Sequence, residues 1–224
     1  MNKYPPFKMP LDEAMRTQRS IRRVTKEPID DQLLLDIIEL GTHSPNTRNA
    51  QTWEFMIIKD PAVKKQLAEQ NYFLYKRIKK GEAKRAKHDP SHQKINDALD
   101  WAAENFEHYP AMIIACYRGG RFAWPLLMIA SHFASIFPAV QNIMLAARSV
   151  GLGANLATMP LWNNRKCRKI LALLSALTPA AIITLGWPQG NYGPISRKPV
   201  GDVVSLNHYG NRPWAKRADQ SEAL

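Results

Sequence analysis

A small group of basic and hydroxyl side chains stands near the start of the chain. Residues 17–23 read Thr-Gln-Arg-Ser-Ile-Arg-Arg, which places Arg19, Arg22 and Arg23 around Ser20 directly after a short amphipathic segment. A guanidinium is permanently charged and presents a planar fork of donors that matches phosphate oxygens, while a serine hydroxyl adds a neutral donor. The group therefore indicates a phosphate site, and a solvated basic turn is the alternative.

The other side chains that could do chemistry do not form a recognisable catalytic or metal-binding set. Cys116 lies in an apolar run and Cys167 lies among basic residues, and their spacing fits neither a disulfide framework nor a metal site. No Ser-His-Asp or Cys-His arrangement is evident. We interpret His132 as a hydrogen-bonded core histidine. We therefore expect no metal ion and no nucleophilic side chain at the site.

The charge balance favours anionic ligands or partners. The 224 residues include 31 Lys and Arg against 19 Asp and Glu, a formal net charge of +12. The densest basic segment is Lys76–His88, and a basic nucleic-acid-binding module is the alternative outside enzymes. However, no aromatic residue between Lys76 and Pro90 could stack on bases, and no known nucleic-acid-binding signature is present. We interpret the segment as a surface helix or lid and expect no nucleic-acid partner.

The elements that must position these residues alternate between helices and strands. Hydrophobic spacing predicts helices over 11–17, 31–40 with Gly41 as the stop, 62–78, 95–106 and 163–174, and strands over 53–59, 111–117, 180–185 and 200–205. We expect a mixed central sheet covered by helices on both faces, which is an α+β fold of three α/β/α layers.

One uncharged run is long enough to span a bilayer. It covers the 26 residues Phe122–Ala147 between two arginines. Because polar residues such as Ser131 and Gln141 interrupt it, we predict a buried central helix that begins at Pro125 and is kinked or divided at Pro138. We expect no membrane partner.

The length suits one domain over residues 1–224, with an N-terminal arm at 1–10 and a C-terminal tail at 206–224. The opening Met-Asn-Lys-Tyr-Pro-Pro lacks the apolar core of a signal peptide, which predicts a cytoplasmic protein.

Four segments stand in the order and at the separations known from one family. They are Gln18-Arg19-Ser20-Ile21-Arg22-Arg23, the run 44–55 (Ser-Pro-Asn-Thr-Arg-Asn-Ala-Gln-Thr-Trp-Glu-Phe), the run 151–161 (Gly-Leu-Gly-Ala-Asn-Leu-Ala-Thr-Met-Pro-Leu), and Leu185-Gly186-Trp187-Pro188 with Arg197-Lys198-Pro199. Together they resemble the FMN-dependent nitroreductase family, with some likeness to its deiodinase-like branch. The resemblance extends from about Leu11 to Val204 and implies a nitroreductase-like fold.

The resemblance implies an FMN site whose first part lies in residues 18–23. In the family this motif, usually Arg-Arg-Ser-x-Arg, wraps the FMN phosphate and ribityl chain, a role that falls here to Arg19, Ser20 and Arg22. Gln18 stands where the first arginine usually lies, and the lost charge is expected to loosen the grip on FMN. Arg197 resembles the late arginine that returns to the phosphate.

The resemblance also implies that two subunits share the site. The family's second motif is supplied by the other subunit, so Pro45, Asn46, Asn49 and Gln51 are expected to reach a partner's FMN across the interface of an intertwined, obligate homodimer. Thr52 replaces the usual proline of that motif.

The third motif, Ala157-Thr158-Met159, resembles the loop along the flavin ring, where Thr158 alone offers a hydroxyl for flavin N5. The implied reaction transfers hydride from NADH or NADPH to N5 and then to an electron-poor acceptor such as a nitroaromatic or quinone. No Gly-rich dinucleotide fingerprint is needed if the nicotinamide stacks on the flavin. Reductive dehalogenation of a halophenol is the alternative within flavoproteins.

Overall fold

The computed structural model describes residues 7–86, 90–119, 126–193 and 195–215. The chain divides into two compact units, Met1–Asn191 and Tyr192–Leu224. The first unit contains the sheet and the six α-helices found in the described ranges, and the second contains the 3-10 turn η4 (Val200–Asp202).

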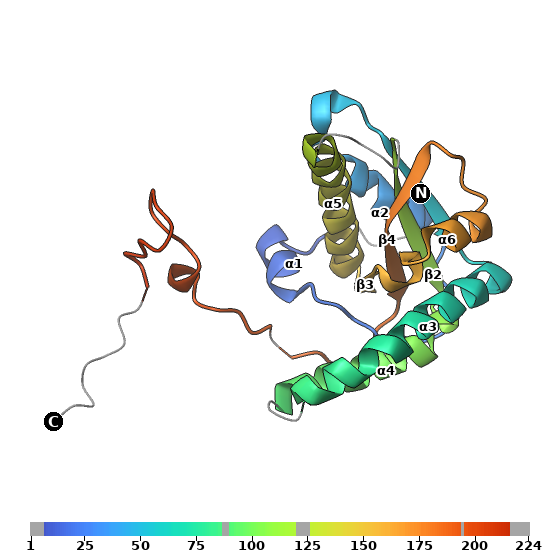
Figure 1. Cartoon of the computed structure of the whole chain (residues 1–224), viewed down its shortest axis with the longest axis horizontal. Coiled ribbons are helices and arrows are strands. Elements are labelled where there is room, and N and C mark those ends of the chain that lie inside the picture. Colours follow the sequence, from blue (N-terminus) through green and yellow to red (C-terminus); the bar gives the residue numbers. More distant parts are fainter. Residues whose placement is uncertain (1–6, 87–89, 120–125, 194, 216–224) are drawn as a thin grey trace. The chain divides into compact units, whose positions relative to one another are not determined.

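A four-stranded sheet forms the middle layer of the first unit (Figure 1). Its strands are β1 (Trp53–Ile58), β2 (Ala111–Arg118), β3 (Gly153–Ala157) and β4 (Leu177–Gly186), in the order β1-β2-β4-β3. All three pairings of these strands are antiparallel, whereas a mixed sheet was expected. The one parallel contact in the described chain is an isolated bridge between Ser20 and Ala154.

The strand directions follow from how the helices return the chain. After β1 the chain passes through α3 (Pro61–Ala86) and α4 (Pro90–Glu104), which pack against each other as a hairpin. The hairpin brings the chain back to the edge that it left, so that Met112 of β2 lies opposite Ile58 of β1. Sequence periodicity shows that helices are present but does not show whether they return the chain to the same edge.

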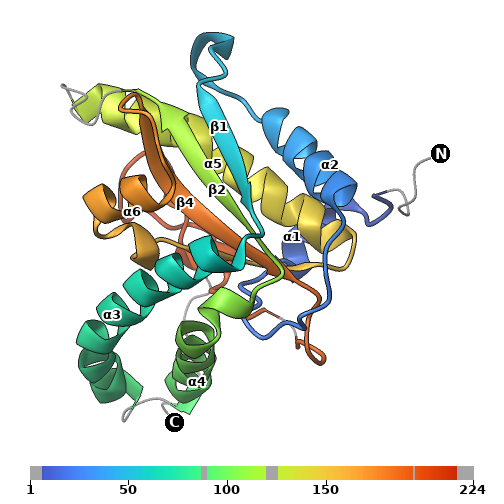
Figure 2. The same ribbon diagram turned by 90° about the vertical axis from the view of Figure 1, so that its right-hand side faces the viewer.

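Helices cover both faces of the sheet (Figure 2). Alternate residues of β2 divide between two cores, because successive side chains of a strand point to opposite faces. Ile113 and Ala115 face a core built with α2 (Asp31–Thr42) and α5 (Leu126–Ser149). Met112 and Ile114 face a core that includes residues of α3 and of α6 (Asn164–Ile170). The three-layer α/β/α arrangement and the α+β class are thus confirmed.

The predicted elements are present with altered ends, except for one strand. The helix at 11–17 is α1 (Leu11–Thr17) as predicted, α3 is longer than predicted, and α6 is shorter. The predicted strand at 200–205 is wrong, because η4 occupies its start and Val200 and Val203 are 74% and 61% exposed, so no sheet face is buried there. In contrast, β3 forms a strand in the third motif, where none was predicted.

One predicted helix stop and one predicted division of a helix do not occur. Helix α2 begins where the Asp30 side chain accepts a hydrogen bond from Gln32 N at 2.7 Å, and it continues through Gly41 to Thr42. A Cβ on Gly41 would lie 2.5 Å from Ile143 Cγ1 of α5, so this glycine allows the two helices to pack closely. Helix α5 continues through Pro138 without division. Pro125, its predicted start, lies outside the described residues.

No helix in the described ranges has the length and the unbroken apolarity that crossing a membrane requires.

Candidate functional site

The first motif, Gln18–Arg23, lies against β3 and the end of β4. Ser20 and Ala154 form a bridge, and Ile21 N donates to Ala154 O at 3.0 Å. On the other side of the motif, Gln189 N donates to Arg23 O at 3.0 Å. Main-chain hydrogen bonds therefore hold the first motif beside the third motif, which occupies β3 and the residues after it.

Two glycines make room for this segment. Gly153 of β3 and Gly186 of β4 lie opposite each other in the sheet. A Cβ on Gly153 would lie 2.5 Å from Ile21 Cγ2, and one on Gly186 would lie 2.6 Å from Val24 Cγ2. Ile21 and Val24 join the core on the α3 side of the sheet. The first motif is thus packed onto bare backbone, an arrangement that a larger residue in either strand would prevent.

Arg22 is a partly buried cation within this motif. Burial lowers the pKa of its guanidinium, and the neighbouring Arg19 lowers it further, while Tyr109 acts in the opposite direction. Among the described residues, no carboxylate forms an ion pair with Arg22. A partly desolvated cation without a carboxylate is suited to an anion supplied from outside the chain.

The other predicted residues of the first motif differ in orientation. Ser20 is exposed and Arg19 is half-buried, so both border solvent beside β3. The Gln18 side chain turns toward α5, where its Nε2 lies 3.8 Å from Met144 Sδ. The residue that departs from the family pattern therefore contacts the helix layer.

The third motif supplies a hydroxyl and a buried amide. Ala157 is the last residue of β3, Thr158 is exposed, and Met159 opens the 3-10 turn η3 (Met159–Leu161). Asn155 is only 5% exposed, and its Oδ1 has no hydrogen-bond partner among the described residues. By strand alternation it points to the same face as Gly153, where Ile21 lies. An unsatisfied buried acceptor on that face is suited to a ligand with hydroxyl or amide donors.

The second motif forms a strained loop before β1. Arg48, Asn49 and Gln51 have φ values of 56°, 51° and 47°, a region that non-glycine residues rarely adopt. The Asn46 side chain stabilises the loop by accepting from Gln51 N at 2.9 Å. Pro45, Asn49 and Gln51 are exposed, so the loop presents them to solvent.

A cavity of about 360 Å³ lies between this loop and α5. It is lined by Thr47, Arg48, Ala50, Thr52, Ser131, His132 and Ser135. Thr47 N donates to Ser135 Oγ at 3.2 Å, which joins loop and helix. His132 is half-buried and its ring stacks on Tyr117 with centroids 4.8 Å apart. The interpretation of His132 as a core residue is therefore wrong.

The first and second motifs lie at opposite corners of the sheet. The first motif adjoins Ala154 of β3, and Ala154 pairs with Leu185 of β4, which pairs in turn with Ala111 at the start of β2. The second motif lies at the other end of β2, where Arg118 N donates to Thr52 O. The two ends of β2 are roughly 20 Å apart at the usual rise per residue. The motifs also adjoin opposite edge strands, β3 and β1, which adds about 14 Å across three strand spacings. One chain therefore does not bring its own first and second motifs together.

The late arginine of the predicted site belongs to the second unit. Arg197 is exposed, and its Nη1 donates to Ser196 O at 2.8 Å. Its role at a phosphate stays a prediction.

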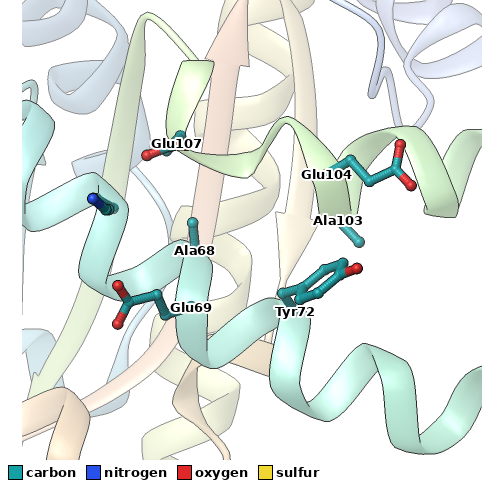
Figure 3. A pocket seen from close by; sticks show the side chains of 7 residues that line it. Ala68, Glu69, Tyr72, Ala103, Glu104 and Glu107 are labelled. Atoms are coloured by element: carbon teal, nitrogen blue, oxygen red, sulfur yellow. The ribbon is translucent and has the colours of Figure 1, made fainter.

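A separate groove of about 350 Å³ lies between α3 and α4 (Figure 3). Its lining includes the carboxylates Glu69, Glu104 and Glu107 beside Tyr72 and Lys65. Because three carboxylates repel an anion, this groove is unsuited to a phosphate. The first motif remains the better anion site.

Comparison with known proteins identifies the family. A family model described as the nitroreductase family matches residues 15–187. The chain belongs to the nitroreductase family. A relative from Thermus thermophilus named NADH dehydrogenase is 26% identical over 208 residues, which cover 85% of this chain and 93% of that protein. Family membership confirms the resemblance and makes the chain an oxidoreductase.

Solved structures agree on the fold. Nitroreductase A from Vibrio parahaemolyticus has a TM-score of 0.65 and 21% identity, with 89% of this chain and 75% of that one covered. Iodotyrosine deiodinase, solved with FMN and 3-iodo-L-tyrosine, has a TM-score of 0.67 and 20% identity, with 89% and 100% covered.

The structure adds residues for which the sequence assigned no role at the site. Gly153, Gly186 and Asn155 lie in quoted motifs, but the close packing at the two glycines and the burial of the Asn155 amide are evident only when the first motif is seen to pack on β3. Tyr109 lies outside every motif, yet its hydroxyl donates to Arg22 O at 2.8 Å. No sequence signal links it to a residue 87 positions earlier.

Proposed function

We propose that this chain binds FMN and carries hydride from NADH or NADPH to an electron-poor acceptor such as a nitroaromatic or a quinone. The observation that carries the proposal is the partly buried Arg22 guanidinium, which has no carboxylate partner among the described residues and lies on a segment held against β3. The deiodinase structure, which contains FMN, and the relative named NADH dehydrogenase support the choice of ligands.

The chain's own residues would bind and orient the cofactor. Arg19, Ser20 and Arg22 offer cationic and neutral donors to a phosphate and to ribityl hydroxyls, and Asn155 Oδ1 offers a buried acceptor. Thr158, at the end of β3, offers a hydroxyl to the ring. When bound, FMN supplies a ring that accepts and donates hydride. The protein then contributes binding, orientation and electrostatics.

The test is a spectrum and a titration of the purified protein. We expect bound flavin absorbance, or its appearance on adding FMN, followed by bleaching with NADH or NADPH and recovery with a quinone. Arg22→Met should weaken FMN binding by about tenfold or more, since hydrogen bonds to a charged group contribute about 1.5–3 kcal/mol. A colourless protein that takes up no FMN would refute the proposal.

We further propose that FMN lies between two copies of the chain. The separation of the first and second motifs at opposite corners of one sheet supports this arrangement, as does the exposure of Asn49 and Gln51 on a strained loop. A two-fold dimer would bring the second motif of one copy to the first motif of the other.

Subunit mixing tests the shared site. Arg22→Met impairs the first motif, and a paired Asn49→Ala, Gln51→Ala variant impairs the second. If one site uses both copies, a randomly reassorted mixture regains about a quarter of wild-type FMN sites, because half of the dimers are mixed and each has one intact site. Mixing that restores nothing, with dimer exchange shown by differently tagged chains, would contradict the arrangement.

Reductive dehalogenation of a halophenol is a second candidate. A 57-residue segment is 28% identical to iodotyrosine deiodinase from Nematostella vectensis. The test is consumption of 3-iodotyrosine under dithionite, with tyrosine and iodide measured as products. Rapid quinone turnover without iodide release would favour the first candidate.

A further inference from the structure

We propose that Tyr109 is a positioning residue for the flavin site, and that its hydroxyl, by donating to the main-chain carbonyl of Arg22, fixes the first motif in the conformation that receives the anion. The inference rests on the proposed function, since it assumes that Arg22 binds FMN. Tyr109 need not touch the cofactor, because it acts through Arg22.

The Tyr109 hydroxyl occupies a fixed place. The residue is 1% exposed and lies just before β2. Its ring packs edge-on against Trp101 of α4 at 6.3 Å between centroids and against Phe106 at 5.9 Å. Because the ring is packed on two sides, its rotamer is fixed, and the hydroxyl donates to Arg22 O at 2.8 Å.

Lys64 holds the main chain of Tyr109. Its Nζ donates to Tyr109 O at 2.9 Å from the first turn of α3, and Lys64 is 8% exposed. Burial lowers the pKa of Lys64, while Asp60 and Glu107 favour its charged form. Tyr109 therefore stands between the α3–α4 hairpin and the first motif, and both its carbonyl and its hydroxyl are engaged.

The hydrogen bond from Tyr109 fixes the Arg22 carbonyl within the first motif. Ile21 N is bonded to Ala154 O on one side, and Arg23 O is bonded to Gln189 N on the other. The peptide between Arg22 and Arg23 lies between these anchors, and the Tyr109 hydroxyl sets its orientation. Without the Tyr109 hydroxyl the Arg22 carbonyl loses its hydrogen-bond partner, and a main-chain shift that satisfies this carbonyl elsewhere would move the Arg22 Cα and carry its side chain with it.

The test is Tyr109→Phe in the full-length protein, which removes one oxygen atom and keeps the ring packing. We expect FMN binding, measured by quenching of flavin fluorescence, to weaken about three- to tenfold, as the loss of one neutral hydrogen bond implies. The control is Tyr75→Phe. Tyr75 is 4% exposed, and its hydroxyl donates to Asp100 Oδ1 at 2.8 Å within the α3–α4 hairpin. That variant should lose comparable thermal stability and keep FMN affinity.

A double-mutant cycle separates positioning from a general structural role. If Tyr109 acts through Arg22, Tyr109→Phe should change FMN affinity little in an Arg22→Met background. Equal weakening in both backgrounds, or wild-type affinity in Tyr109→Phe, would overturn the inference. Should Tyr109→Phe fold poorly, Lys64→Met provides the second measurement, with weaker FMN binding expected and unchanged affinity counting against the inference. Failure of the wild-type chain to bind FMN would instead refute the proposed function.

Discussion

Replacing Gly153 by alanine tests whether the approach of the first motif to β3 builds the site. The new Cβ would lie 2.5 Å from Ile21 Cγ2 and 2.8 Å from Ile21 Cβ, whereas carbon atoms pack best at about 3.5–4.0 Å. Ile21 must therefore move by about 1 Å. Overpacking of this kind costs about 1–3 kcal/mol, or a fall in Tm of about 2–12 °C for a chain of this size.

The same substitution should also weaken FMN binding. Ile21 immediately precedes Arg22 in the chain, and a displacement of about 1 Å at a binding group can weaken its function up to about a hundredfold. We expect Gly153→Ala to weaken FMN binding at least tenfold, measured by fluorescence titration well below the Tm.

Gly81→Ala is the matched control. Gly81 lies in α3, is exposed, and has no described heavy atom within 4 Å of an added Cβ. Alanine there should raise stability by about 0.5–1 kcal/mol, because glycine is unfavourable within a helix, and should leave FMN affinity unchanged. If Gly153→Ala binds FMN as tightly as wild type with an unchanged Tm, the proposed packing of the first motif on β3 is wrong.

Three further outcomes are expected. Cys116 and Cys167 are both 0% exposed, so neither should react with DTNB in the native protein at pH 8, and both should react in guanidinium; fast native labelling would contradict their burial. Burial raises the pKa of the Cys116 thiol to about 12 and that of the Cys167 thiol to about 11. The contribution of the two neutral thiols to the free energy of unfolding is therefore present below pH 9 and lost as pH rises toward 12. In a variant with alanine at both positions, the urea midpoint should fall less steeply with rising pH. Asn155→Leu should weaken FMN binding while holding or raising Tm, because it removes a buried acceptor that has no partner in the described part of the chain; unchanged affinity would exclude Asn155 from the site.

The layers of the fold could be predicted because they depend on local patterns. The apolar run at 111–117 became β2, and Leu34 and Ile37 of the predicted helix at 31–40 lie on the buried face of α2. What failed depended on contacts between distant segments. Gly41 was predicted to end a helix, but Ile143 of α5 requires a small residue there, and a glycine that ends a helix and one that admits a neighbour look the same in one sequence.

At the candidate site, too, residues that follow a local motif could be predicted and those that depend on distant contacts could not. Family resemblance indicated Arg19, Ser20 and Arg22 by their types and order, and the structure places this motif beside the third motif through β3. Tyr109 could not be found in this way, because a hydrogen bond to a main-chain carbonyl imposes no residue type on its partner. Gln18 was indicated by its position in the same motif, and only the structure shows that its side chain contacts Met144 of α5, while its role at FMN stays a prediction.

These contacts show how the proposed anion site in the first motif is ordered without a rigid element of its own. It belongs to no helix and to no named strand, and it begins only after α1 ends at Thr17. Contacts with other segments hold it in place, namely main-chain hydrogen bonds to Ala154 and Gln189 and a hydrogen bond from the Tyr109 hydroxyl. Because each contact comes from a different element, loosening any one should reduce FMN affinity before it unfolds the sheet, and FMN affinity is therefore the more sensitive measure of this packing.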